Sequence, residues 1–133
     1  MTPERFAKRI KAIARDIPAN TTASVNRAAG LILATVIPST PVDTGRARGN
    51  WQVNIFNPIT SEIERLDKTG GATLTAGRQT IATRPPGATI YISNNVNYIG
   101  RLNEGWSAQA PANFVEKAVQ TAIAHIRNAR IVR

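Results

Sequence analysis

The triplet Asp43-Thr44-Gly45 is the part of the sequence whose residue types come closest to a catalytic motif. In aspartic proteases this triplet supplies one of two carboxylates that share a proton. Here the triplet occurs once, is preceded by Pro41 rather than by an apolar strand, and is followed by the charged Arg46. A protease would therefore need a homodimer, and the sequence shows no glycine-rich flap pattern. We interpret the triplet as structural.

The residues around the triplet have the chemistry of a tight turn. Pro41 fixes φ and has no backbone donor, so a helix cannot continue through it. The Asp43 carboxylate can accept a hydrogen bond from the backbone two residues on, as in an Asx-turn, and Gly45 can adopt a positive φ. We therefore predict that Pro41, Asp43, Thr44 and Gly45 form a structural turn between a helical layer and a sheet.

Composition excludes several kinds of site. The chain has no cysteine and a single histidine, His125, so a thiolate site, a disulfide or a multi-histidine metal site is impossible within one chain. The glycines at 70–71 lack the lysine and the preceding strand of a phosphate-binding loop. No apolar run is long enough for a membrane span or a signal core. We expect no cofactor, no membrane partner, and a soluble protein made in a cytoplasm.

The formal net charge is +9, from 17 basic and 8 acidic residues. Such a charge on a small chain favours an acidic partner, either nucleic acid or a negatively charged protein surface. The basic residues are scattered rather than massed, so solubility alone is an equally good interpretation. A basic module that binds nucleic acid without sequence preference stays open as an alternative function.

The elements that would position the turn begin with a long helical pattern. The length of 133 residues predicts a single domain, 1–133. Apolar residues at helical spacing predict a helix over 3–36, and Pro18 predicts a break or kink near 16–20. The predicted turn follows this helix directly, so the end of the helix fixes where the turn begins.

The second half of the chain predicts a small sheet and two more helices. Alternating apolar and polar residues predict strands over 49–56 and 88–94. A short helix is expected over 98–105 and the last helix over 111–129, beginning at Pro111. The fold class is therefore α+β: a long N-terminal helical segment, a small antiparallel sheet and a C-terminal helix packed on it.

The region 57–87 has no clear pattern. Ile63 and Leu66 permit a return strand. Residues 74–81 permit a short helix that Gly77 would weaken, and a surface loop crossing the sheet is the alternative.

Several short segments, taken in order, resemble one protein family. The segments are Pro41-Val42-Asp43-Thr44-Gly45 with Arg46 and Arg48 after a long helix, Ile90-Tyr91-Ile92-Ser93-Asn94-Asn95, Asn97-Tyr98, Leu102-Asn103-Glu104-Gly105, and Trp106-Ser107-Ala108-Gln109-Ala110-Pro111. Their order and spacing resemble the neck or tail-completion family, the small head–tail joining proteins of long-tailed bacteriophages.

The resemblance implies a structural virion protein without enzymatic activity, made in the cytoplasm of the host bacterium. It implies a ring of identical copies, for which we expect six or twelve, in the neck between the portal-side head connector and the tail terminator or tail tube. Double-stranded DNA would pass through this ring without being read. The residues expected at the subunit interface are Arg46, Arg48, Tyr98, Glu104 and Trp106, with an arginine at 46 or 48 facing Glu104 of the next copy.

Overall fold

The structure is a computed structural model and describes residues 22–131. The predicted helix start at residue 3 and the break near Pro18 lie outside the described residues. The elements follow one another as α2 (Thr22–Ser39), α3 (Arg46–Gly49), β1 (Trp51–Ile55), α4 (Gly71–Ala82), β2 (Ile90–Asn94), α5 (Ile99–Asn103) and α6 (Phe114–Ile131).

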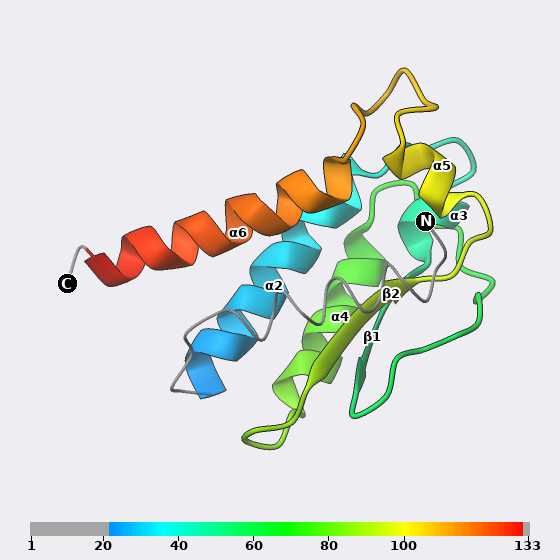
Figure 1. Cartoon of the computed structure of the whole chain (residues 1–133). Coiled ribbons are helices and arrows are strands. Elements are labelled where there is room, and N and C mark those ends of the chain that lie inside the picture. The colour runs from blue at the N-terminus through cyan, green and yellow to red at the C-terminus, as the bar shows by residue number, and fades with distance from the viewer. Residues whose placement is uncertain (1–21, 132–133) are drawn as a thin grey trace.

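Helix α2 is the central element. It packs against α6 on one side and against α4 and the sheet on the other (Figure 1). Strands β1 and β2 form a two-stranded antiparallel sheet in which Val53 pairs with Ile92. The apolar face of this sheet joins buried side chains of α2 and α6 in one core cluster. The predicted α+β fold, with its small antiparallel sheet and its C-terminal helix on the same core, is confirmed.

Helix α2 continues to Ser39 and so contains Pro38 in its last turn, whereas we expected it to stop before this proline. The hydroxyl groups of Ser39 and Thr40 donate hydrogen bonds to the carbonyl oxygens of Thr35 and Val36, both at 2.7 Å. These bonds occupy carbonyls at the end of the helix, where backbone donors are scarce. Helix α2 therefore ends one residue after the proline.

Helix α6 begins at Phe114 rather than at Pro111. Asn113 has a positive φ of 62°, which lies outside the right-handed helical region. The side-chain oxygen of Asn103 accepts a hydrogen bond from the Val115 N–H at 3.0 Å and so caps the helix. The cap comes from α5, which is why the local sequence around Pro111 did not reveal the true start.

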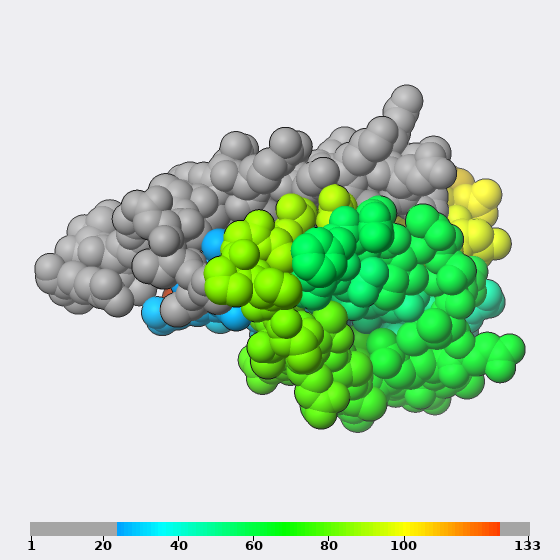
Figure 2. All heavy atoms as spheres, turned by 90° about the horizontal axis from the view of Figure 1, so that it is seen from below, coloured from blue at the N-terminus to red at the C-terminus, as the bar shows by residue number. Residues whose placement is uncertain are grey.

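The return strand that we considered around Ile63 and Leu66 does not form. The backbone groups of this segment form hydrogen bonds with side chains instead of with the backbone of a strand. The Asn50 side chain donates to the Ile63 carbonyl oxygen at 3.1 Å and accepts from its N–H at 2.9 Å. Gln52 Nε2 donates to the Ser61 carbonyl oxygen at 2.8 Å. Figure 2 shows this green segment, together with α4, forming much of the molecular surface on that side.

Of the two alternatives for residues 67–87, the helix is confirmed and the crossing loop is wrong. Gly77 was expected to weaken this helix, yet it lets α4 approach its neighbours closely. A Cβ at Gly77 would lie 2.2 Å from Leu33 Cδ2 on α2 and 3.1 Å from Val53 Cγ2 on β1. The glycine thus lowers the intrinsic helix propensity of this segment, but it lets α4 pack closely against both α2 and β1.

The start of α4 is organised by a buried carboxylate. Asp67 is 9% exposed and accepts hydrogen bonds from Gly70 N–H (3.0 Å), Thr73 N–H (2.8 Å), Thr73 Oγ1 (2.7 Å) and Thr69 Oγ1 (3.4 Å). Burial raises the pKa of this carboxyl group. The hydrogen bonds from Thr73, Gly70 and Thr69 outweigh burial and hold the pKa below its usual value.

We predict that Asp67→Asn lowers the free energy of unfolding at pH 7 by about 1–3 kcal/mol, because an amide NH₂ replaces an acceptor. Since the native pKa lies below the ordinary value of about 3.9, the carboxylate stabilises the fold fully above about pH 4, and this contribution is lost as the pH falls further. Urea unfolding at several pH values should show the two proteins converging in acid. Glu64→Gln, at an exposed site, is the control; a constant gap down to acid pH would contradict the assignment.

Candidate functional site

The predicted turn is present, but a different side chain closes it. Gly45 has the expected positive φ, 89°. The Thr44 hydroxyl oxygen accepts a hydrogen bond from the Arg46 N–H at 3.3 Å. Asp43 is exposed, and no described residue donates a hydrogen bond to its carboxylate. The expected Asx-turn is therefore wrong, and the Asp43 side chain is available for a partner.

The backbone of Gly45 also joins the turn to the segment that begins α4. Its carbonyl oxygen accepts from the Gly49 N–H at 2.8 Å and from the Asp67 N–H at 3.1 Å. A Cβ at Gly45 would lie 2.7 Å from the backbone nitrogens of both Asp67 and Lys68. Only glycine supplies both the positive φ and the space that this contact requires.

Arg48, expected at a subunit interface, is engaged within its own chain. Its guanidinium donates to the carbonyl oxygens of Pro38 (3.2 Å), Thr40 (2.8 Å) and Lys68 (2.5 Å). The charge sits at the C-terminal end of α2, where the helix dipole favours a cation. The side chain thus ties this helix end to the segment before α4, which argues against a role in facing a neighbouring copy.

Arg46 is also paired, although at the surface. Its guanidinium forms an ion pair with Glu62. The hydrogen bond and the charge of Glu62 both raise the pKa of Arg46. Exposed ion pairs add little stability, so this pair fixes the position of the arginine more than it stabilises the fold.

The loop between α5 and α6 is bound to the turn by the side chain of Gln109, which forms hydrogen bonds with both backbone groups of one residue, as a paired strand would. The Gln109 amide accepts from the Val42 N–H and donates to the Val42 carbonyl oxygen, each at 2.9 Å. At the base of the loop, the Asn113 N–H donates to the Asn103 carbonyl oxygen at 2.6 Å. Two segments more than sixty residues apart in sequence are therefore held side by side.

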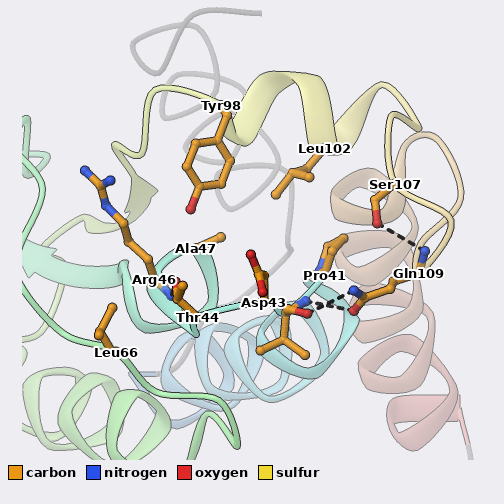
Figure 3. A pocket seen from close by; sticks show the side chains of 11 residues that line it. Pro41, Asp43, Thr44, Arg46, Ala47, Leu66, Tyr98, Leu102, Ser107 and Gln109 are labelled. Carbon is orange, nitrogen blue, oxygen red and sulfur yellow. Dashed lines mark hydrogen bonds between the residues drawn. The ribbon is translucent and has the colours of Figure 1, made fainter.

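Between these segments lies an open hollow of about 520 Å³. Figure 3 shows it below α5, with the turn on the opposite side and the α5–α6 loop beside it. The residues that line the hollow are Pro41, Val42, Asp43, Thr44, Arg46, Ala47, Leu66, Tyr98, Leu102, Ser107 and Gln109. Most of this surface is apolar, so the hollow is suited to contact with another molecule.

Two polar groups point into the hollow. In Figure 3 the Tyr98 hydroxyl approaches from α5 and the Asp43 carboxylate from the turn. Burial raises the pKa of Tyr98; the Arg46 charge opposes this effect, while Glu62 and Asp43 add to it. Tyr98 therefore remains a neutral hydroxyl that can donate a hydrogen bond.

Trp106 is displayed next to the hollow. Its side chain is 71% exposed, and the Arg101 guanidinium carbon lies 5.4 Å from the ring centroid, within cation–π range. Glu104 is exposed on the same loop. Of the five residues expected at an interface, Arg46, Tyr98, Glu104 and Trp106 thus belong to the hollow or to the adjoining loop, whereas the half-buried Arg48 binds backbone carbonyls of its own chain.

Within residues 22–131, no cluster of His, Asp or Glu side chains is arranged to hold a metal ion, and no described helix is long and apolar enough to cross a membrane. Comparison of the chain with protein-family models, with curated proteins and with solved structures found no match.

Sequence reasoning missed the residues that assemble this site. Asp67 and Gln109 act through contacts with distant backbone. Around Asp67 the sequence indicates only a turn, because aspartate and paired glycines are turn residues. For Gln109 no local signal exists, since its partner lies on another segment.

We predict that Arg48→Ala lowers the free energy of unfolding by about 2 kcal/mol, because charge-assisted hydrogen bonds to carbonyls are lost. Arg46→Ala removes the same side chain from an exposed ion pair and should leave stability near the wild-type value. Thermal and urea unfolding of both variants tests the difference. Equal effects of the two substitutions would show that Arg48 does not hold the end of α2.

We predict that Gly45→Ala is more damaging than Gly87→Ala. Both glycines have positive φ, 89° and 81°, but a Cβ at Gly87 meets nothing within 4 Å. The control, Gly87→Ala, should therefore lower the free energy of unfolding by about 1 kcal/mol through backbone strain alone. Gly45→Ala should lose about 3 kcal/mol, because steric conflict adds to the same strain. Equal losses in urea unfolding would mean that the contact with Asp67 is not tight.

Proposed function

We propose that this chain is a structural virion protein of a tailed bacteriophage, acting in the neck. Copies would form a ring that joins the head connector to the tail and surrounds the DNA channel. No enzymatic activity is part of this role.

The observation that carries the proposal is the convergence of the segments on which the family resemblance rests. Val42 is bonded to Gln109, and the Asn94 amide donates to the Ala47 carbonyl oxygen at 2.8 Å. Tyr98 faces the same hollow. Residues that are scattered in the sequence therefore meet at one corner of the fold, partly in its interior and partly around the hollow, which is expected if they serve one interaction.

The character of that surface also supports binding to protein. A large exposed tryptophan beside an apolar hollow is typical of protein interfaces, which are enriched in aromatic residues and arginine. The loop that displays Trp106 is anchored at Val42 and at Asn103. An anchored loop loses little conformational freedom when it docks.

The net charge of +9 favours a second candidate, a basic module that binds nucleic acid without sequence preference. Salt separates the two proposals. Affinity for a short double-stranded DNA, measured by fluorescence anisotropy, should fall steeply with salt if phosphate binding is the function. Ring assembly through an apolar surface should change far less.

Native mass spectrometry and negative-stain microscopy of the full-length protein would test the ring directly. The protein should be measured alone and with the connector and tail proteins of the same phage. A closed ring of constant copy number, bound to either partner, supports the proposal. A monomer in every mixture contradicts it.

We predict that Trp106→Ala weakens this assembly while the fold persists. Truncation of a tryptophan within a protein interface commonly costs about 2 kcal/mol or more, so the concentration needed for assembly should rise by more than about tenfold. Loss of the exposed contact with Arg101 should lower monomer stability by less than about 1 kcal/mol. Mass photometry and thermal unfolding measure the two effects; assembly equal to wild type would remove Trp106 from the interface.

A further inference from the structure

We infer that the hollow binds an arginine or lysine side chain from residues 3–17 of a second copy of this chain. The inference rests on the proposed ring, because it assigns one contact between neighbouring copies. The hollow of one copy would receive the N-terminal segment of the next.

The chemistry of the hollow selects a basic side chain with an apolar stem. Leu66 and Leu102 provide apolar wall, and Asp43 presents a carboxylate to which no described residue donates a hydrogen bond. Arg46, which also lines the hollow, is already paired with Glu62. The site therefore combines apolar surface with one exposed carboxylate that has no hydrogen-bond donor among the described residues.

Arginine and lysine fit this combination because their methylene stems pack on apolar surface while the charged end reaches a polar group. The Asp43 carboxylate would accept a charge-assisted hydrogen bond from the cation. The ring of Tyr98, on the other side of the hollow (Figure 3), offers an aromatic face to the same charge.

The surroundings favour a peptide segment over a small molecule. The hollow, of about 520 Å³, is open to solvent rather than enclosed. Its wall includes Leu66, which is 69% exposed. Trp106, which is 71% exposed, precedes the lining residue Ser107 in the chain. A segment that carries apolar residues beside its basic ones covers both the hollow and this rim.

Residues 3–17 have this composition. They contain five basic and two acidic residues, and Phe6, Ile10, Ile13 and Ile17 recur at helical spacing. Identical copies of a chain with net charge +9 repel one another unless basic groups on one copy meet acidic groups on the next. A basic segment seated at Asp43 of the neighbouring copy provides such a complementary contact.

The absence of cysteine from the chain allows a direct test by disulfide cross-linking. One full-length protein would carry Leu66→Cys, at the exposed rim of the hollow, and a second of different mass would carry Ile10→Cys. We expect the mixture to form a disulfide-linked heterodimer under mild oxidation, seen on a non-reducing gel. A partner with Gln79→Cys, at an exposed position on α4, replaces Leu66→Cys as the control for random collision and should cross-link far more slowly.

Charge reversal tests the role of the carboxylate. Adding Asp43→Lys to the Leu66→Cys protein should slow heterodimer formation by about tenfold, because the new lysine would repel the basic side chains of residues 3–17 at the hollow. Glu64→Lys makes the same change at an exposed site outside the hollow and should leave the rate near that of the Leu66→Cys protein. Equal rates with both substitutions would overturn the assignment to Asp43.

A single chain carrying both Ile10→Cys and Leu66→Cys separates contact within a chain from contact between chains. An intramolecular disulfide in this protein, with no heterodimer in the mixture, would overturn the role of a second copy. Failure of both cross-links while the wild-type protein still forms rings would overturn this inference alone. Failure of the wild-type protein to form rings with its partners bears instead on the proposed neck function.

Discussion

The fold depends on the close contact between the backbone of Gly45 and that of Asp67. The Gly45 carbonyl oxygen accepts two hydrogen bonds, one from an N–H of α3 and one from the Asp67 N–H. The two backbone segments lie so close that no side chain fits between them at Gly45. Arg48 reinforces the same contact by binding carbonyl oxygens at the end of α2 and at Lys68. The helical layer, the sheet and α4 are therefore positioned from this one corner.

The elements with strong periodicity could be predicted from sequence, because their pattern follows from which face is buried. The two strands and the helical segments on either side of them are of this kind, as is the positive φ at Gly45, which glycine alone adopts readily. The boundaries were less predictable. Helix α2 runs past Pro38 to Ser39, and α6 starts late because its cap is Asn103, from another helix.

The candidate site was only partly predictable, since its parts meet through long-range contacts. The sequence pointed to Asp43, Tyr98 and Trp106, but not to the hollow they surround. It assigned a turn hydrogen bond to Asp43 that Thr44 makes instead, and it did not reveal the bonds of Arg48 to backbone carbonyls of its own chain. In each case a residue of the right type had several possible partners, and only the folded arrangement selects one.

The segment between β1 and α4 has a further consequence for dynamics. It is held to the sheet by the side chains of Asn50, Gln52, Ser93 and Asn95 rather than by a ladder of backbone hydrogen bonds. Each of these bonds can break without disturbing the pairing of β1 with β2. The part of the segment that precedes Arg65 is therefore able to open as a local unit, exchanging its amide hydrogens while the contact between Gly45 and Asp67 stays closed. Phe56, with its positive φ of 76°, lies where this segment leaves β1.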